Sequence, residues 1–479
     1  MTQVYSIHSG NPHICIFIQS CSDTLNVEDH KEMAVDASQY FQNIGPQYAP
    51  MMRLFLGLMV TVTAAYDASF HVKKPIFKRG VFFASNVFYF LNHSAAGKRA
   101  SEYMTHIDAD TQKVLWSLPD KALFRRASLF VYPHIEVSGN FQVTFEKDED
   151  QVDENIVKSK YIKTLHEGIP STVQNVSVRI IKSQPLKSKY SDTVKMDYPV
   201  MTKFLSMIHH VTPHEHRKDH ELHPGFMFHV HGGGFMALTS FSHEPYLRQW
   251  VTHTNLRILS VDYTRTPDQH FPVQLEECYQ AYKWILKNGS QDLGLHLEKS
   301  KIIFVGDSAG GNIVSALLMR IIEEDKLRRP DALVLAYPAM YLEFSPSPAR
   351  IMSTLDPLLN TSILKMCGDE YISKEEELND PSHDAKHNPY ISPAVIPDDT
   401  LKQFPPTLIS TGALDPLFDD AWYFAKRLEQ ANGENGVSMH VYDTLGHGYL
   451  NLVTLIPEAR VASERISDWV RDNVLLNEQ

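Results

Sequence analysis

The segment 302–311 constrains the fold of this chain more than any other. Ile302-Ile303-Phe304-Val305 is a short apolar run bounded by turn residues, which is typical of a buried strand. Gly306-Asp307-Ser308-Ala309-Gly310 follows directly, and apolar residues at helical spacing come next. The order strand, sharp turn and helix places Ser308 on a tight turn, where glycines leave room for the backbone. Free N–H groups at the helix start favour negative charge nearby, so Ser308 is predicted to be a nucleophile.

After about residue 170 the chain alternates strand-like and helix-like segments. Continuous apolar strands separated by amphipathic helices predict an α/β fold, in which a largely parallel sheet is covered by helices on both faces. Ligands of such folds bind at the carboxyl ends of the strands, and Ser308 follows one of these ends. The predicted strands are 226–230, 258–261, 302–305, 333–336, 407–410 and 439–442.

The first third of the chain has a different pattern. Period-two alternation is nearly absent before residue 130 and becomes clear only at 173–180. We therefore predict a mainly helical domain over residues 1–170 and an α/β domain over residues 171–479. The predicted helices of the first domain are 26–43, 51–70, 77–91 and 103–115.

Composition and charge exclude several classes of protein. The net charge of -12 argues against nucleic-acid binding, which needs clustered Lys and Arg, and leaves only a local patch for attachment to an acidic membrane. The four cysteines form no CxxC pair, as expected in a reducing compartment. We see no signal peptide, and the apolar stretch 54–65 is shorter than the ~20 residues of a membrane span. We therefore expect a cytoplasmic protein with a buried helix at 54–65.

A nucleophilic serine needs a base, and the base needs an orienting acid. His447 lies between two glycines after the last predicted strand, and Asp415 follows the strand before it. Alternatively, His447 is a surface-loop residue and Asp415 caps a helix that begins near Asp419. Asp419 and Asp420 are rival acids, but they are predicted to lie in the first turn of that helix. Ser308, Asp415 and His447 occur in the chain order of an α/β-hydrolase triad, so we predict that they converge.

A glycine run predicts the donors that would stabilise an oxyanion. His231-Gly232-Gly233-Gly234 follows the strand 226–230, and three glycines let backbone N–H groups approach a substrate carbonyl. Gly232, Gly233 and Gly234 are the candidates, with the last two favoured, and the N–H of Ala309 completes the set. The alternative is an ordinary glycine turn.

These motifs resemble the hormone-sensitive lipase family of α/β-hydrolases. The segments that carry the resemblance are 231–234, 306–311, 415–416 and 446–447, with 239–247, 345–350, 352–359, 39–41 and 64–67. The resemblance implies hydrolysis of diacylglycerols, monoacylglycerols, cholesteryl esters and retinyl esters. Ser308 would be the nucleophile, His447 the base and Asp415 the acid, with oxyanion glycines at 232–234. It implies no cofactor and no metal, with lipid droplets and a second copy of the chain as candidate partners.

Other features keep alternatives open. Larger members of the family carry a long regulatory insertion, but only 47 residues separate Cys367 from Asp415 here, which predicts a short form.

Six histidines within 209–223 suggest either a zinc site or, as the default, a polar linker. Ser128 follows two arginines, as in a kinase site, although its apolar neighbours suggest burial. The rival functions are a carboxylesterase or deacetylase of small soluble esters, and a receptor of the same fold that lacks the histidine retained here as His447.

Overall fold

The structure is a computed structural model of the 479-residue chain. It describes residues 47–104, 109–117, 120, 135–145, 165, 175–182, 225–353, 356, 358–373 and 384–476. The predictions for helix 26–43, Ser128 and the histidines of 209–223 lie outside these residues, as do Cys15 and Cys21.

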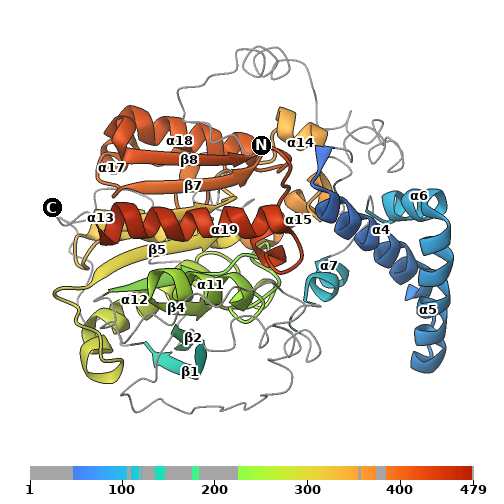
Figure 1. The fold of residues 1–479 in the computed structure, drawn as a ribbon, viewed down its shortest axis with the longest axis horizontal. Helices are drawn as coiled ribbons and strands as arrows, with labels where there is room; N and C mark the ends of the chain where they lie inside the picture. The colour runs from blue at the N-terminus through green and yellow to red at the C-terminus, as the bar shows by residue number, and fades with distance from the viewer. Residues whose placement is uncertain are drawn as a thin grey trace.

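A mostly parallel eight-stranded sheet forms the centre of the protein (Figure 1), with the order β1-β2-β4-β3-β5-β6-β7-β8. Strand β2 pairs antiparallel with β1 and β4, and the other neighbours are parallel. All the predicted strands and the α/β fold class are confirmed. The strands are β1 Glu136–Thr144, β2 Asn175–Lys182, β3 Gly225–Val230, β4 Arg257–Asp262, β5 Lys301–Asp307, β6 Ala332–Ala336, β7 Thr407–Gly412 and β8 Val437–Tyr442.

Strand β1 corrects the predicted organisation of the chain. It lies within the region assigned to a helical domain, yet it forms the edge of the central sheet beside β2. The sheet therefore begins at Glu136, and a boundary at residue 170 would separate two paired strands. The register shifts between Ser138 and Asn140, so a bulge interrupts the alternation by which the strand would be predicted.

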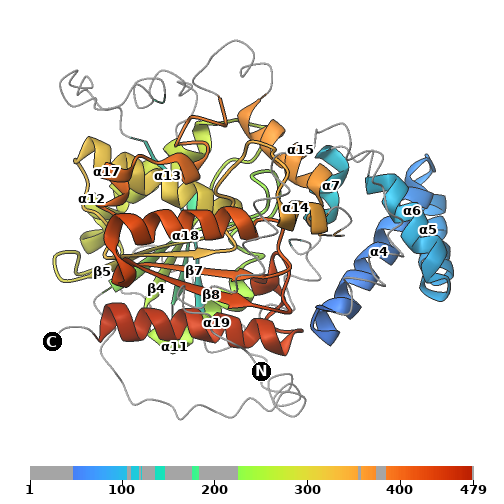
Figure 2. The ribbon, with the colours of Figure 1, turned by 90° about the horizontal axis from the view of Figure 1, so that it is seen from above.

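Helices cover both faces of the sheet (Figure 2). Helices α12, α13 and α18 lie on one face, and α11 and α19 lie on the other. The helices are α11 Glu244–Thr254, α12 Val273–Asp292, α13 Ala309–Glu324, α14 Pro348–Met352, α15 Thr361–Ile372, α17 Asp398–Leu401, α18 Phe418–Asn432 and α19 Pro457–Val470. Short helical turns are η4 Pro393–Val395, η5 Glu434–Gly436, η6 Tyr449–Leu452 and η7 Arg471–Leu475.

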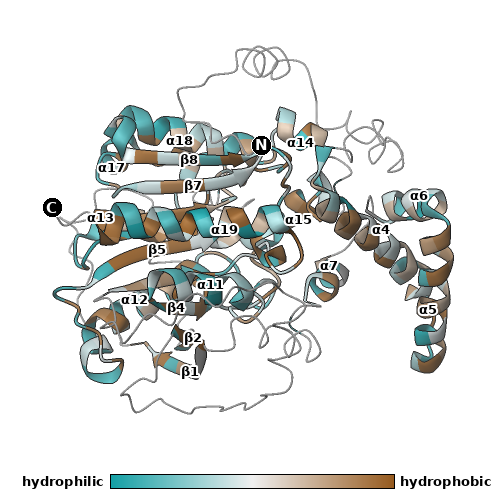
Figure 3. Ribbon diagram, in the orientation of Figure 1, coloured by the Kyte–Doolittle hydropathy of each residue, from teal (hydrophilic) through white to brown (hydrophobic). Residues whose placement is uncertain are grey.

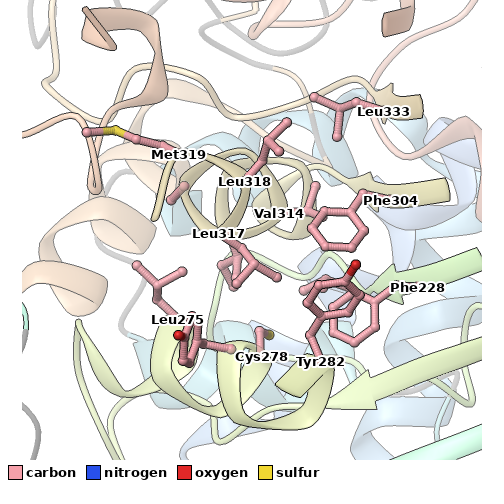
Figure 4. Packing of buried hydrophobic residues seen from close by; sticks show 14 of the residues in the cluster. Phe228, Leu275, Cys278, Tyr282, Phe304, Val314, Leu317, Leu318, Met319 and Leu333 are labelled. Carbon is pink, nitrogen blue, oxygen red and sulfur yellow. The ribbon is translucent and has the colours of Figure 1, made fainter. Parts of the chain in front are cut away.

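The sheet has a separate core on each face because successive side chains of a strand point in opposite directions. On β5, Phe304 packs toward α12 and α13, whereas Ile303 and Val305 pack toward α11 and α19. Figure 4 shows the first core, where the ring of Phe304 lies 5.3 Å from that of Phe228 and 4.8 Å from that of Tyr282. This packing holds the strand that leads into Ser308.

Among the described residues, four helices precede the sheet: α4 Pro50–Phe70, α5 Pro75–Leu91, α6 His93–Met104 and α7 Ala109–Trp116. The predicted helices 51–70 and 77–91 are confirmed, and the one predicted over 103–115 is divided between α6 and α7. Helices α4, α5 and α6 pack together and project away from the sheet (Figures 1 and 2). Helix α7 lies instead against α15.

Helix α4 differs from the buried, short helix predicted for residues 54–65. It has 21 residues, and by length and composition alone it could cross a membrane. Only 39% of its most apolar window is buried. Packing against α5 and α6 buries part of α4, and length and composition alone are weak evidence for a membrane span.

Phe304→Ala is expected to lower the free energy of unfolding by about 3–5 kcal/mol, because the lost ring leaves a cavity between β5 and α12. Urea denaturation followed by circular dichroism measures this change. The control Tyr423→Ala removes a side chain that is 52% exposed, so it should shift stability by less than about 0.5 kcal/mol. Equal losses in the two variants would contradict the proposed core.

Candidate active site

Ser308 occupies a strained turn between β5 and α13. Its φ of 51° and ψ of -120° are unfavourable for a residue with a side chain. The Ser308 N–H donates to the carbonyl of Ala336 at 2.9 Å, which ties the turn to β6. A Cβ at Gly306 would lie 2.3 Å from the Gly310 carbonyl oxygen, and a Cβ at Gly310 would lie 2.0 Å from that of Val230. The turn therefore requires glycine at both positions.

The structure brings Ser308, His447 and Asp415 together at the carboxyl ends of three strands. The Oγ of Ser308 lies 2.9 Å from Nε2 of His447, and Nδ1 of His447 lies 2.9 Å from Oδ2 of Asp415. A carboxylate only accepts hydrogen bonds, so Nδ1 carries the proton and Nε2 can accept the serine hydroxyl proton. Asp415 is completely buried, and Ser308 and His447 are each 8% exposed.

Asp415 also stabilises the turn before α18, since its Oδ1 accepts from the N–H of Leu417 at 2.8 Å. The capping role and contact with His447 therefore coexist, and the second bond limits rotation of the carboxylate. The rival acids Asp419 and Asp420 lie in the first turn of α18, as predicted. Asp420 pairs with Arg350 at 2.6 Å, and burial raises the pKa of Asp420 to about 6.

The glycine run after β3 adopts the open backbone that was predicted. Gly233 and Gly234 have φ angles of 114° and 59°. A Cβ at Gly234 would lie 2.5 Å from Sγ of Cys367 and 2.8 Å from the ring of Trp116. Within the described part of the chain, no acceptor is found for the backbone N–H groups of Gly233, Gly234 or Ala309. These three groups are free to bind an oxyanion beside Ser308.

Gly232 differs from the prediction. Its N–H donates to Oδ1 of Asp307 at 3.0 Å, so it is already engaged and is removed from the candidate oxyanion donors. The contact fixes the start of the glycine run to the residue that precedes Ser308. A Cβ at Gly232 would lie 2.6 Å from Oδ2 of Asp307, which explains why this position also needs glycine.

Asp307 is the centre of a buried polar network that the sequence analysis did not identify. Besides Gly232, its carboxylate accepts from the hydroxyl of Tyr246 at 3.1 Å. Nε2 of His243 lies 3.3 Å from Oδ2, and Nε2 of His229 lies 3.6 Å from Oδ1. These partners come from β3 and from the start of α11, so only the folded chain reveals the cluster.

The carboxylate of Asp307 forms an ion pair with His243. Nδ1 of His243 lies 2.7 Å from the carbonyl of Thr239, which only accepts, so this nitrogen is protonated. Burial by itself lowers the pKa of His243, but the charge of Asp307 outweighs burial and raises the pKa. Conversely, burial raises the pKa of Asp307, but His243 and then His229 hold it well below its ordinary value.

The other two histidines of the network are neutral. Burial lowers the pKa of His229, whose ring nitrogens lie 2.7 Å from Oγ of Ser260 and 2.9 Å from the hydroxyl of Tyr246. Burial also lowers the pKa of His231 to about 3, and its Nδ1 donates to the Gly232 carbonyl at 2.8 Å. The histidines thus anchor the glycine run without adding further charge.

The beginning of α4 supports the loop that carries His447. The Ala49 N–H donates to the Thr444 carbonyl at 3.0 Å. The Tyr48 hydroxyl donates to Asp356 at 2.9 Å, and a Cβ at Gly446 would lie 2.9 Å from the Tyr48 ring. Residues from the first third of the chain therefore help to hold the histidine loop, although no local sequence signal connects them.

An apolar cluster covers the glycine run beside Ser308. It combines Met236 and Ala237, which follow the run, with side chains from α15, and Trp116 of α7 packs against it. Its buried members are Met236, Ala237, Ala339, Leu359, Ile363, Leu364, Cys367 and Leu417. Among the described residues, no group of three or more His, Cys, Asp or Glu side chains is arranged to hold a metal ion.

Comparisons with known proteins agree with this fold. The sequence profile of the alpha/beta hydrolase fold matches residues 227–451. An esterase from the archaeon Pyrobaculum calidifontis superposes with a TM-score of 0.53 at 20% identity, over 77% of this chain and 93% of that one. An esterase of Acinetobacter venetianus is 26% identical over 51% of this chain and 73% of its own length. The domain that contains Ser308, Asp415 and His447 is therefore an α/β-hydrolase domain.

Relatives of higher identity match a shorter part of the chain. Hormone-sensitive lipase of Mus musculus is 44% identical over 149 residues, which are 31% of this chain and 19% of that protein. The Homo sapiens protein of the same name is 42% identical over 31% of this chain and 14% of its own length. The chain thus spans about a fifth or less of the length of these relatives. Over this region the chain is similar to hormone-sensitive lipase, within its α/β-hydrolase domain.

Asp307→Asn is expected to lower the free energy of unfolding most between about pH 4 and pH 6.5. Because folding lowers the pKa of Asp307, its carboxylate raises the free energy of unfolding at pH values above its ordinary pKa of 3.8. This contribution is lost as the pH falls below 3.8 toward the lowered pKa of the folded state. The raised pKa of His243 gives stability that is present below 6.5 and is lost as the pH rises. Urea denaturation across this range tests the ion pair.

The exposed variant Asp399→Asn is the matched control and should show little change at any pH, because that carboxylate is 93% exposed. A difference between Asp307→Asn and the parent protein that stays constant from pH 4 to pH 8 would exclude a charged pair.

Proposed function

We propose that the chain is a serine carboxylic ester hydrolase that cleaves neutral lipid esters through an acyl-enzyme on Ser308. The observation that carries the proposal is the continuous chain of hydrogen bonds from Ser308 through His447 to Asp415, with 2.9 Å at each step. This chain lies beside three backbone N–H groups that have no acceptor among the described residues. Nucleophile, base, acid and oxyanion donors therefore occupy one site.

The proposed reaction has two halves. Ser308 Oγ attacks the ester carbonyl carbon while His447 Nε2 takes the hydroxyl proton, and Asp415 stabilises the imidazolium. His447 then protonates the leaving alcohol as its bond to the carbonyl carbon breaks, which leaves the acyl-enzyme. Water repeats the sequence, with His447 as base, and releases the carboxylic acid and the free serine. No cofactor takes part in these steps.

The N–H groups of Gly233, Gly234 and Ala309 would hold the oxyanion of both tetrahedral intermediates. One such donor typically contributes about 2.7–4 kcal/mol to lowering the barrier. The positive charge of His243 also matters here, because it balances the Asp307 carboxylate next to Ser308. Without it, an unpaired negative charge behind the turn would oppose the developing oxyanion.

One observation favours neutral lipid esters as substrates. Relatives at 42–44% identity over 31% of this chain are named hormone-sensitive lipase. Diacylglycerols, monoacylglycerols, cholesteryl esters and retinyl esters form the proposed class. We propose that the enzyme works in the cytoplasm, in contact with lipid droplets. We also expect it to form a homodimer. A carboxylesterase of small soluble esters is the second candidate, because other relatives are named simply esterase.

Ser308→Ala is expected to lower the rate of lipid-ester hydrolysis by at least about 1,000-fold, since the acyl-enzyme no longer forms. Release of fatty acid from emulsified diacylglycerol measures the rate, and labelling with an organophosphonate reports the nucleophile. Ser290→Ala, at an exposed position of α12, is the matched control and should keep the parental rate. Hydrolysis by Ser308→Ala at the parental rate would refute the assignment, and failure of the parent to label would favour a receptor.

Acyl-chain length separates the two candidate substrates. We expect faster hydrolysis of emulsified long-chain diacylglycerol and cholesteryl ester than of soluble acetate esters, because a site for neutral lipid esters gains apolar contact with each added methylene of the acyl chain. The measurement is kcat/KM for a series of esters that differ in acyl-chain length. A steep decrease as the acyl chain lengthens would instead identify a small-ester hydrolase.

A further inference from the structure

Helix α5 lies at the outer edge of the molecule, far from the central sheet (Figures 1 and 2). Its main contacts are with α4 and α6. Of its 17 residues only Tyr89 is buried, although most of its side chains are apolar. A helix of this composition normally buries one face, so the exposed face of α5 needs a partner.

Much of this helix appears brown, and therefore hydrophobic, in Figure 3, and it carries a stripe of exposed large apolar residues. At 3.6 residues per turn, five of them fall within an arc of about 100°. Phe83 is 73% exposed and Leu91 is 78% exposed. The five residues are Ile76, Phe83, Val87, Phe90 and Leu91.

The charged residues on and next to α5 are mainly cationic. Residues 68–101 contain six Lys and Arg and no Asp or Glu, in a chain whose net charge is -12; Asp67 and Glu102 flank this segment, and Asp67 pairs with Arg99 at 2.7 Å. Lys73 and Lys74 are exposed at the turn that leads into α5, and Arg79 is exposed within the helix. The Lys78 ammonium lies 5.3 Å from the ring of Phe70 instead. An exposed apolar stripe bordered by cations thus stands out from an otherwise acidic protein.

We propose that the stripe and its cations, termed the α5 face, dock onto a phospholipid surface that carries anionic headgroups. Aromatic and aliphatic side chains would enter the boundary between headgroups and acyl chains, while Lys73, Lys74 and Arg79 would bind the headgroups. Docking would bring the esterase site to its lipid substrates, so the purpose of this contact rests on the proposed function. The binding itself does not depend on catalysis.

The charge pattern favours lipid over a second copy of the chain. A symmetric dimer would place the same patch of each copy against the other, and the cations of both would then lie close together. An anionic surface instead neutralises them. Attraction of this kind contributes about a fivefold change in partitioning for each cation at low salt and weakens as salt screens it.

Flotation of the full chain with vesicles tests the proposal. Vesicles of phosphatidylcholine alone are compared with vesicles that also contain phosphatidylserine, at low and high salt. We expect binding to the phosphatidylserine vesicles that decreases at high salt. The triple variant Lys73→Gln, Lys74→Gln, Arg79→Gln should lower partitioning by about 100-fold. The double variant Phe83→Ser, Phe90→Ser should abolish it.

Matched controls lie on the α/β domain. One is the triple variant Lys299→Gln, Lys326→Gln, Lys402→Gln, and the other is Tyr423→Ser, Leu455→Ser, and all five positions are exposed. Both controls should bind as the parent does. Hydrolysis of a small soluble ester and circular dichroism should be unchanged in the α5 variants, which shows that they fold.

Several outcomes would overturn the proposal. Equal binding to both kinds of vesicle at every salt concentration would exclude recognition of anionic headgroups. Absence of binding together with a dimer that Phe83→Ser, Phe90→Ser dissociates would assign the face to a second copy. Absence of binding by a monomer would indicate that another part of the chain covers the face. The Ser308→Ala variant should bind the vesicles as the parent does. A failure of the proposed catalytic function would therefore leave the vesicle-binding result unchanged.

Discussion

The turn at Ser308 is the constraint on which the rest of the site depends. A residue with a side chain is held at a φ of 51°, and the surrounding elements can enforce this only by close backbone contact. Gly310 approaches the Val230 carbonyl of β3, and Asp307 binds the N–H of Gly232 just beyond the same strand. The serine and the glycine run are therefore positioned relative to each other by one set of contacts, which the flanking core stabilises.

The fold and the three converging side chains could be predicted because the relevant signals are local. Strands β3 to β7 are largely buried on both faces and contain short apolar runs, and β8 alternates buried and half-buried residues. Ser308, Asp415 and His447 each follow a strand of their own. Strand β1 was missed because a bulge breaks its alternation. The link between Tyr48 and Asp356 joins residues 308 positions apart, so no window of sequence contains it.

The role of Asp307 was also beyond a reading of the sequence. In the motif it occupies a variable position, and its partners His229 and His243 resemble any other histidines along the chain. Only the fold shows that the pKa of His243 is raised and that of His229 lowered, because the charge of Asp307 outweighs burial at His243, whereas burial outweighs it at His229. The two charges of the Asp307–His243 pair offset each other within the protein interior, where an isolated charge would be strongly unfavourable.

The length of helix α4 fixes the distance between the loop that carries His447 and the turn before α5. Its 21 residues extend for about 32 Å, from the contact with the histidine loop to the turn before α5. Each residue added or removed would displace the far end by about 1.5 Å and rotate it by about 100°. Insertions or deletions in α4 are therefore best tolerated in whole helical turns. Any other change in length would rotate α5 and α6 to a new orientation relative to Ser308.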